Sequence, residues 1–309
     1  MTYLLDLRDI NVGGGLGSTV KILRDNVQVG DSENITELVA AIQGKQVLLV
    51  THGFNVDRAG GEVNLDDLDL LLPSVANRMM IGVLWPGDAD WGFIKAAVYV
   101  FKDHDSRRSG DMLAKFINLN FDGATSVSFA SHSLGARVML ETILNLNRMV
   151  HQLILMAGAI DDNCLTKEYE DAAARVDHIS VLASRKDTVL SRTFPIGNFL
   201  AGLIGRGHPY WHAALGHAGP ASAIPDRLDP VFMIPDSWQF NHGSYLPDQP
   251  VTLPANCAVT GVLPSPATSD LPECACPTAP PLVPDPCDLA GVHSPWKPAW
   301  TAAYIASRL

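Results

Sequence analysis

The sequence has few basic residues for its length. Its 309 residues include 22 Lys and Arg against 33 Asp and Glu, and the formal net charge is -11 at pH 7. Proteins that bind nucleic acids usually neutralise the phosphates with clusters of Lys and Arg side chains. The acidic balance therefore argues against a nucleic-acid partner, and we expect none.

Long apolar runs are also missing. No stretch reaches the roughly 18 apolar residues that a membrane-spanning helix needs. The first residues lack the basic and apolar segments of a secretory signal. Hydrophobic residues nevertheless make up 47% of the chain, which is enough for a well-packed core. We expect a globular, cytoplasmic protein without a transmembrane segment.

Cysteine is scarce outside the end of the chain. Cys164 stands alone in the body, and four others lie in the C-terminal fifth: Cys257, Cys274, Cys276 and Cys287. These four could form two disulfides, bind a metal or remain free thiols. Their spacing matches no standard zinc pattern. We therefore predict no metal site and no cofactor.

Short apolar runs alternate with helical patterns over most of the chain. Helical spacing is clear at Ile35, Leu38, Val39 and Ile42, which recur at one face of a helix. The runs that we expect to form strands are residues 2–7, 20–23, 47–51, 80–84, 127–130, 151–156 and 179–183. This alternation predicts an α/β fold, with a mostly parallel sheet covered by helices on both faces.

The stretch VSFASHSLGARV at residues 127–138 carries the strongest catalytic signal. A β-favouring run ends at Ala130, Ser133 follows in a small-x-Ser-x-Gly turn, and a helix-forming run extends to about residue 145. Ser131 and Gly135 are small, which lets the strand and helix backbones close on each other. A strand, a tight turn with serine at its apex and a helix form the nucleophile elbow of α/β-hydrolases. The pattern therefore predicts Ser133 as a nucleophile.

A serine nucleophile needs a base, and the base needs an acid that orients it. The order Ser, acid, His of the α/β-hydrolases is met by Ser133, Asp187 and His242. Each follows a strand-like run, and the carboxyl ends of parallel strands meet at one edge of a sheet. Rivals remain for two of these roles: Asp161 and Asp162 for the acid, and His208, His212 and His217 for the base.

Backbone N–H groups are expected to stabilise the oxyanion that forms during acyl transfer. One should belong to Leu134, the residue after the nucleophile, and the other to Phe54 in the HGFN loop that follows the predicted strand at 47–51. We expect His52 to brace this loop. We expect His132 to point away from the nucleophile and to pack against its neighbours.

Five motifs carry a resemblance: THGFN (residues 51–55), WP (85–86), SHSLG (131–135), SRKD (184–187) and HGSY (242–245). Over residues 47–245 the chain resembles the α/β-hydrolase superfamily, and in detail a bacterial branch of uncharacterised esterase/lipase-like serine hydrolases. Its elbow departs from the commoner G-x-S-x-G by starting with Ser131, which this branch tolerates. The resemblance implies an α/β-hydrolase fold and a Ser-His-Asp triad.

We therefore predict a serine hydrolase that cleaves a carboxylic ester, from a small-molecule or lipid-like substrate, through an acyl-enzyme. One alternative is a non-catalytic binding or scaffold protein, because a fold does not fix function. Another is an acyltransferase or amidase that uses the same triad. The apolar segment at residues 194–204 is a candidate lid or acyl-pocket wall, or plain core.

Proline becomes dense after about residue 250. Proline fixes φ and removes a backbone donor, so this part should be extended or irregular. We predict an α/β-hydrolase domain at residues 1–250 and a Pro- and Cys-rich tail at residues 251–309, with a short helix at about 298–309. Because the predicted catalytic residues precede the tail, we expect the tail to be dispensable for the chemistry.

Overall fold

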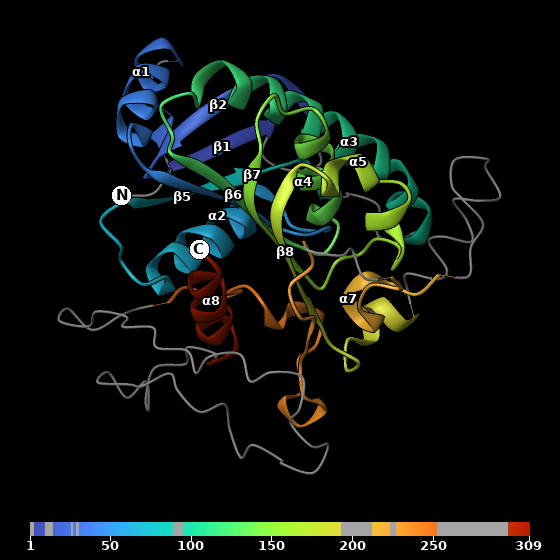
Figure 1. Ribbon diagram of the computed structural model, residues 1–309. Helices are drawn as coiled ribbons and strands as arrows, with labels where there is room; N and C mark the ends of the chain where they lie inside the picture. The colour runs from blue at the N-terminus through green and yellow to red at the C-terminus, as the bar shows by residue number, and fades with distance from the viewer. Residues whose placement is uncertain are drawn as a thin grey trace.

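The computed structural model describes residues 3–9, 15–25, 27–28, 31–88, 95–192, 212–222, 227–251 and 296–309. Within them, nine strands form one sheet in the order β3-β2-β1-β5-β4-β6-β7-β8-β9 (Figure 1). The strands are β1 (Tyr3–Arg8), β2 (Leu16–Arg24), β3 (Val27–Gln28), β4 (Gln46–Thr51), β5 (Arg78–Leu84), β6 (Ser126–His132), β7 (Val150–Met156), β8 (Val176–Ala183) and β9 (Phe232–Met233). In the part of the sheet with the order β1-β5-β4-β6-β7-β8-β9, each strand pairs in parallel with its neighbour. Strand β2 is antiparallel to both β1 and β3.

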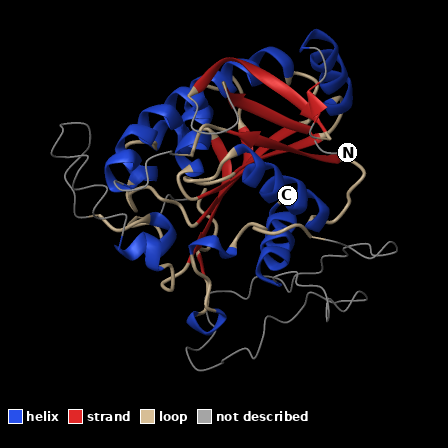
Figure 2. Ribbon diagram, turned by 180° about the vertical axis from the view of Figure 1, so that it is seen from behind, coloured by secondary structure: helices blue, strands red, loops and turns tan. Residues whose placement is uncertain are grey.

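Helices cover both faces of this sheet. The helices are α1 (Asp31–Ile42), α2 (Arg58–Leu71), α3 (Lys95–Asn120), α4 (Gly135–Leu144), α5 (Glu170–Ala173), α7 (Leu215–Ala218) and α8 (Trp296–Arg308). Helices α2 and α8 contact each other on one face, and α3 and α4 contact each other on the other (Figures 1 and 2). None of the described helices is both long and apolar enough to cross a membrane.

The predicted α/β architecture is confirmed, and the seven predicted strand runs correspond to β1, β2 and β4 to β8. The central strands β4 and β6 are covered on both faces: residues Val47 to Thr51 in β4 and residues Val127 to His132 in β6 are all buried. A strand that is buried on both faces needs apolar residues at almost every position, which is why the sequence shows continuous runs. The parallel register brings the carboxyl ends of β4 to β8 to one edge of the sheet.

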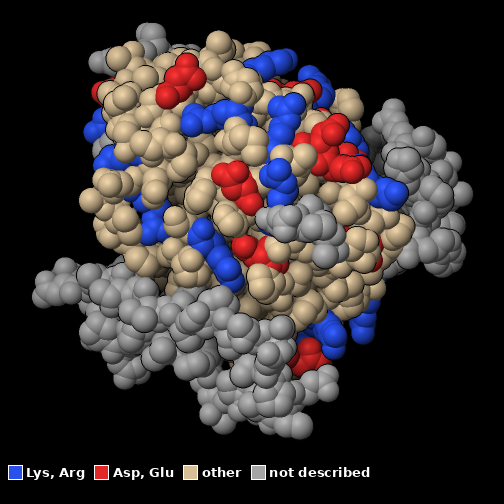
Figure 3. Space-filling model, in the orientation of Figure 1, with Lys and Arg blue, Asp and Glu red and all other residues tan. Residues whose placement is uncertain are grey.

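Charged side chains are mixed on the surface. On the face seen in Figure 3, Lys and Arg side chains lie interspersed with Asp and Glu side chains.

The C-terminal helix α8 packs on the domain through aromatic side chains. We call this set the aromatic cluster: Phe232, Trp238, Phe240, Trp296, Trp300 and Tyr304. The Trp300 ring centroid lies 5.2 Å from that of Phe232, 5.3 Å from that of Trp238 and 5.7 Å from that of Phe240. Trp300 is only 4% exposed. Such ring pairs add stabilisation beyond the apolar area that they bury.

A helix is thus found where the sequence predicts one, and it is part of the packed core. We propose that the folded domain includes the described residues up to 251 together with α8. The cysteine-containing, proline-dense stretch and the candidate lid at 194–204 lie outside the described residues.

Truncating Trp300 tests this packing. Trp300→Ala should lower the free energy of unfolding by about 3–5 kcal/mol, because it removes a large buried side chain and leaves a cavity. Urea unfolding followed by circular dichroism would measure the change. Leu119→Ala, at an apolar side chain that is 81% exposed, is the matched control and should change the value by less than about 0.5 kcal/mol. Equal effects of the two substitutions would show that α8 does not stabilise the domain.

Candidate active site

Ser133 occupies the strained turn between β6 and α4. Its φ is 56°, in the left-handed region that non-glycine residues seldom adopt. Backbone hydrogen bonds hold it there: its N–H donates to the Met156 carbonyl at 3.0 Å, and its carbonyl accepts from Ala159 at 3.1 Å. Strain of this kind persists only where the surroundings enforce it, and it concentrates at functional sites.

The elbow is pressed against the loop that follows β4. A Cβ atom on Gly135 would lie 2.4 Å from the His52 carbonyl oxygen, and a Cβ atom on Gly53 would lie 2.8 Å from Ser133 Cβ. Neither position has room for a side chain. Ser131, the small residue two positions before Ser133, is fully buried within β6.

Three of the predicted residues meet at the carboxyl edge of the sheet. Ser133 Oγ lies 2.8 Å from His242 Nε2, and His242 Nδ1 lies 2.8 Å from Asp187 Oδ2. Because a carboxylate only accepts, His242 Nδ1 carries the proton and Nε2 is left to accept the proton of the Ser133 hydroxyl. The structure therefore brings Ser133, His242 and Asp187 into one hydrogen-bonded series.

The acid of this series is held by the turn after β8. Asp187 is completely buried, its N–H donates to the Ser184 carbonyl at 3.1 Å, and its Oδ1 accepts from the Leu190 N–H at 2.9 Å. Ser184 Oγ donates to the Phe240 carbonyl at 2.7 Å. That bond joins the turn carrying the acid to the segment carrying the histidine.

The NHGS sequence at residues 241–244 orients His242 at the start of a short 3-10 helix, His242–Ser244. Asn241 Oδ1 accepts from the Gly243 N–H at 3.2 Å and from Ser244 Oγ at 2.9 Å, and Ser244 Oγ accepts from the Asn241 N–H at 3.0 Å. This reciprocal capping box satisfies the helix donors and fixes the backbone that presents His242.

His132 makes a contact that sequence reasoning missed. Its Nε2 donates to the His242 carbonyl at 2.7 Å, and the two ring centroids are 4.9 Å apart. Burial and, secondarily, the neighbouring His242 lower the pKa of His132 to about 3. His132 therefore stays neutral and anchors the histidine segment. The sequence signal was its place beside the nucleophile.

Among the described residues, the hydrogen bonds from Ser133 and His242 side chains lead to each other and to Asp187, and not to a rival acid or base. Asp162 Oδ1 pairs with His212 Nδ1 at 3.0 Å, and the Asp161 backbone forms a bridge with Ala214. His217 lies in α7, and His208 lies outside the described residues. In the part of the chain that the structure describes, no group of three or more His, Cys, Asp or Glu side chains is arranged to hold a metal ion.

The two expected oxyanion donors lie on elements that flank Ser133. Leu134 precedes the first residue of α4. Its N–H therefore lies at the N-terminus of this helix, which is the positive end of the helix dipole. Phe54 follows Gly53, whose close approach to the elbow is described above. Asn55 then adopts a φ of 61°, and its N–H donates to the Gly87 carbonyl at 2.9 Å. This turn fixes the course of the loop that carries Phe54.

Two buried histidines should make the stability depend on pH. Burial, with the nearby charge of Arg8 as the second cause, lowers the pKa of His52 to about 3, and the pKa of His132 is lowered to the same value. In the unfolded chain both should have a pKa of about 6.5. Below that pH the unfolded state binds more protons than the folded state. Stability is therefore fully present above pH 6.5 and is lost as the pH falls toward 3.

The slope can be measured with a single variant. Each histidine should contribute up to about 1.4 kcal/mol per pH unit between pH 6 and 4. His132→Asn should reduce the pH dependence of the unfolding free energy by about that amount, whatever it does to the absolute stability. Urea unfolding at several pH values gives both quantities. An unchanged slope in the variant would show that His132 is not held neutral in the folded state.

Comparisons with known proteins identify the family of the chain. The sequence model of a family described as alpha/beta hydrolase of unknown function (DUF900) matches residues 28–200. A predicted CIB-like hydrolase from Thermoplasma acidophilum has 13% identity and a TM-score of 0.36, with 73% of this chain and 83% of that chain covered. Acetyl xylan esterase 1 from Thermoanaerobacterium sp. JW/SL YS485 has 13% identity and a TM-score of 0.35, with 65% and 70% covered.

Esterase PE8 has 16% identity and a TM-score of 0.36, with 65% of this chain and 86% of that chain covered. No curated protein matches the sequence. These three structures are only 13–16% identical to this chain. The family model, in contrast, matches more than half of the chain. The protein therefore belongs to this family of α/β-hydrolases.

Proposed function

We propose that this protein is a serine hydrolase that cleaves a carboxylic ester of a small-molecule or lipid-like substrate. The supporting observation is the series of two 2.8 Å hydrogen bonds that runs from Ser133 through His242 to Asp187. A nucleophile, a base and an orienting acid within hydrogen-bond reach of one another are what acyl transfer requires.

The reaction begins with attack of Ser133 Oγ on the ester carbonyl. His242 Nε2 takes the hydroxyl proton, and the N–H groups of Leu134 and Phe54 stabilise the oxyanion of the tetrahedral intermediate. His242 then gives the proton to the leaving alcohol, and an ester of Ser133 with the acyl group remains. Water, activated by His242, attacks this acyl-enzyme, and the released acid leaves Ser133 free with its proton. No cofactor is required.

Asp187 acts through charge and orientation. Its carboxylate is fully buried and accepts from the Leu190 N–H as well as from His242. The imidazolium that forms in each step is therefore next to a fixed negative charge in a region with little water. A charge pair of this kind is stronger at low dielectric than in solvent.

Replacing the nucleophile is the first test. Ser133→Ala should lower kcat for p-nitrophenyl esters by about 10⁴-fold or more, because the acyl-enzyme cannot form. A panel of acyl chain lengths would also define the preferred substrate. Ser131→Ala is the matched control, at the buried serine two residues earlier in the same elbow, and should keep most of the activity. Loss of activity in Ser131→Ala with near-normal turnover in Ser133→Ala would refute the assignment.

Replacing the acid is the second test. Asp187→Asn keeps the shape but removes the charge and the preference for the correct tautomer of His242, so kcat should fall by about 10⁴-fold. Asp162→Asn should change kcat far less, because Asp162 pairs with His212 and not with His242. Steady-state kinetics of the two purified variants give the comparison. Near-wild-type turnover in Asp187→Asn would remove Asp187 from the mechanism.

A further inference from the structure

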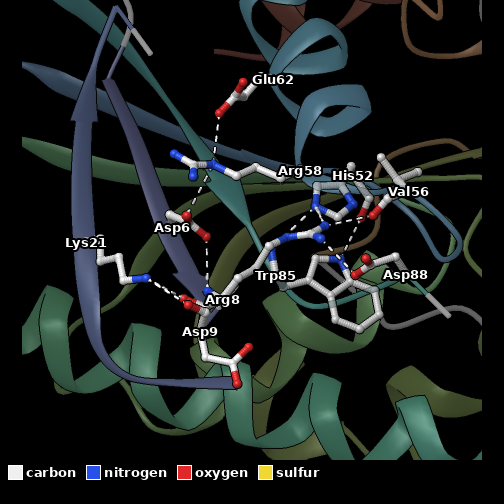
Figure 4. Close-up of polar contacts among 10 residues, drawn as sticks. All are labelled: Asp6, Arg8, Asp9, Lys21, His52, Val56, Arg58, Glu62, Trp85 and Asp88. Carbon is white, nitrogen blue, oxygen red and sulfur yellow. Dashed lines mark hydrogen bonds and ion pairs between the residues drawn. The ribbon is translucent and has the colours of Figure 1, made fainter. Parts of the chain in front are cut away.

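A buried arginine lies beside the loop that carries Phe54. Arg8 is the last residue of β1 and is only 1% exposed. The backbone N–H of Arg8 donates to Asp6 Oδ1 at 3.0 Å, and this bond fixes the backbone at the end of the strand. In the sheet, β1 lies next to β5, and β5 lies next to β4. The Arg8 side chain therefore extends across the end of β5 toward the loop after β4 (Figure 4).

The guanidinium group of Arg8 joins the loops that follow these two strands. Its Nη1 contacts Asp88 Oδ1 at 2.7 Å, after β5, and its Nη2 donates to the Val56 carbonyl at 2.7 Å, after β4 (Figure 4). Nη2 also lies 3.4 Å from His52 Nε2. A planar group with five donors can reach three acceptors on two loops, which a lysine ammonium cannot do in one geometry.

The donors around His52 fix the proton on its ring. Arg8 Nη2 and the Trp85 N–H, 3.3 Å away, both face Nε2, and each can only donate. Nε2 must therefore accept, and the ring proton lies on Nδ1. Nδ1 is 2.9 Å from the Gly53 carbonyl oxygen, to which it donates.

The Gly53 carbonyl belongs to the same peptide group as the Phe54 N–H. A hydrogen bond to the oxygen of a peptide group draws electrons from its nitrogen, which makes the N–H a stronger donor. The series thus runs from the Arg8 charge, through the neutral His52 ring and the Gly53 carbonyl, to the Phe54 N–H. Trp85 closes the arrangement, because its indole N–H donates to the His52 carbonyl at 3.0 Å.

We propose that Arg8 is a positioning residue for the oxyanion hole, acting through His52 and the Val56 carbonyl to fix and polarise the Phe54 N–H. This role rests on the proposed ester hydrolysis. Arg8 does not touch the reacting atoms, and its contribution should be largest when negative charge develops on the substrate oxygen. It should therefore change kcat and leave KM and the midpoint of the pH profile nearly unaltered.

Kinetics of Arg8→Met on a p-nitrophenyl ester test this role. We expect kcat per active site to fall by about ten- to hundredfold, less than the loss of a whole oxyanion donor. KM should stay within about twofold, and the midpoint of the pH profile should not move. Millimolar guanidinium ion should restore part of the lost turnover. Arg24→Met is the matched control. Arg24 is the last residue of the neighbouring β2 and lies on the surface, where it makes an ion pair of the same 2.7 Å length with Glu37 of α1.

The outcomes separate the two proposals. If wild-type turnover depends on Ser133 while Arg8→Met keeps wild-type kcat, the positioning role is overturned and the hydrolase remains. If wild-type protein shows no Ser133-dependent hydrolysis, both proposals fall.

A second variant covers the case in which Arg8→Met does not fold. Removing Arg8 leaves the buried Asp88 carboxylate without this partner, which can prevent folding. Arg8→Lys keeps the positive charge but lacks the planar set of guanidinium donors. A roughly tenfold loss of kcat in this variant supports the positioning role, and an unchanged kcat overturns it.

Discussion

At the carboxyl edge of the sheet, two glycines let a loop and a turn pack closely against each other. The loop after β4 rests on the elbow after β6, and the contact requires glycine at residues 53 and 135. Beside this contact Ser133 has a φ of 56°, held by its backbone hydrogen bonds with Met156 and Ala159. The contact also sets the distance between the two expected oxyanion donors, because each lies one residue from a contact point. The position of the nucleophile therefore depends on the position of the loop after β4, and the reverse is also true.

The histidine is held from a different direction. His242 lies late in the chain, and its segment is fixed by the bond from Ser184 to Phe240, by the contact with His132 and by the aromatic cluster under α8. Lys297 of α8 adds a hydrogen bond of 2.5 Å to the Gln239 carbonyl. The C-terminal helix thus supports the segment that carries the proposed base, although it follows the long stretch at residues 252–295 in the sequence.

The sequence predicted well what depends on local pattern. Buried parallel strands need continuous apolar runs, and the elbow needs small residues around Ser133, so both are visible without a structure. The capping box at residues 241–244 is local too, although only the structure revealed it. Contacts between distant parts of the chain were not predictable in this way. Arg8 meets His52 only because β1 lies two strands from β4 in the sheet, and one arginine in an acidic chain gives no sign of burial.

The helix at the end of the chain shows the same limit. A short helix was predicted at about residues 298–309, but its packing was not, because the sequence of a helix does not show which part of the fold its apolar face contacts. The domain boundary at residue 250 followed from proline density, and the contacts of Trp300 with Phe232 and Phe240 cross that boundary.

The central claim is that Ser133 is a nucleophile activated by His242. Its most direct test is treatment of the native protein with a fluorophosphonate, followed by peptide mass spectrometry. The account predicts one adduct, on Ser133, whose rate of formation falls sharply in His242→Ala. An adduct on another serine, or labelling of Ser133 at the same rate without His242, would contradict it.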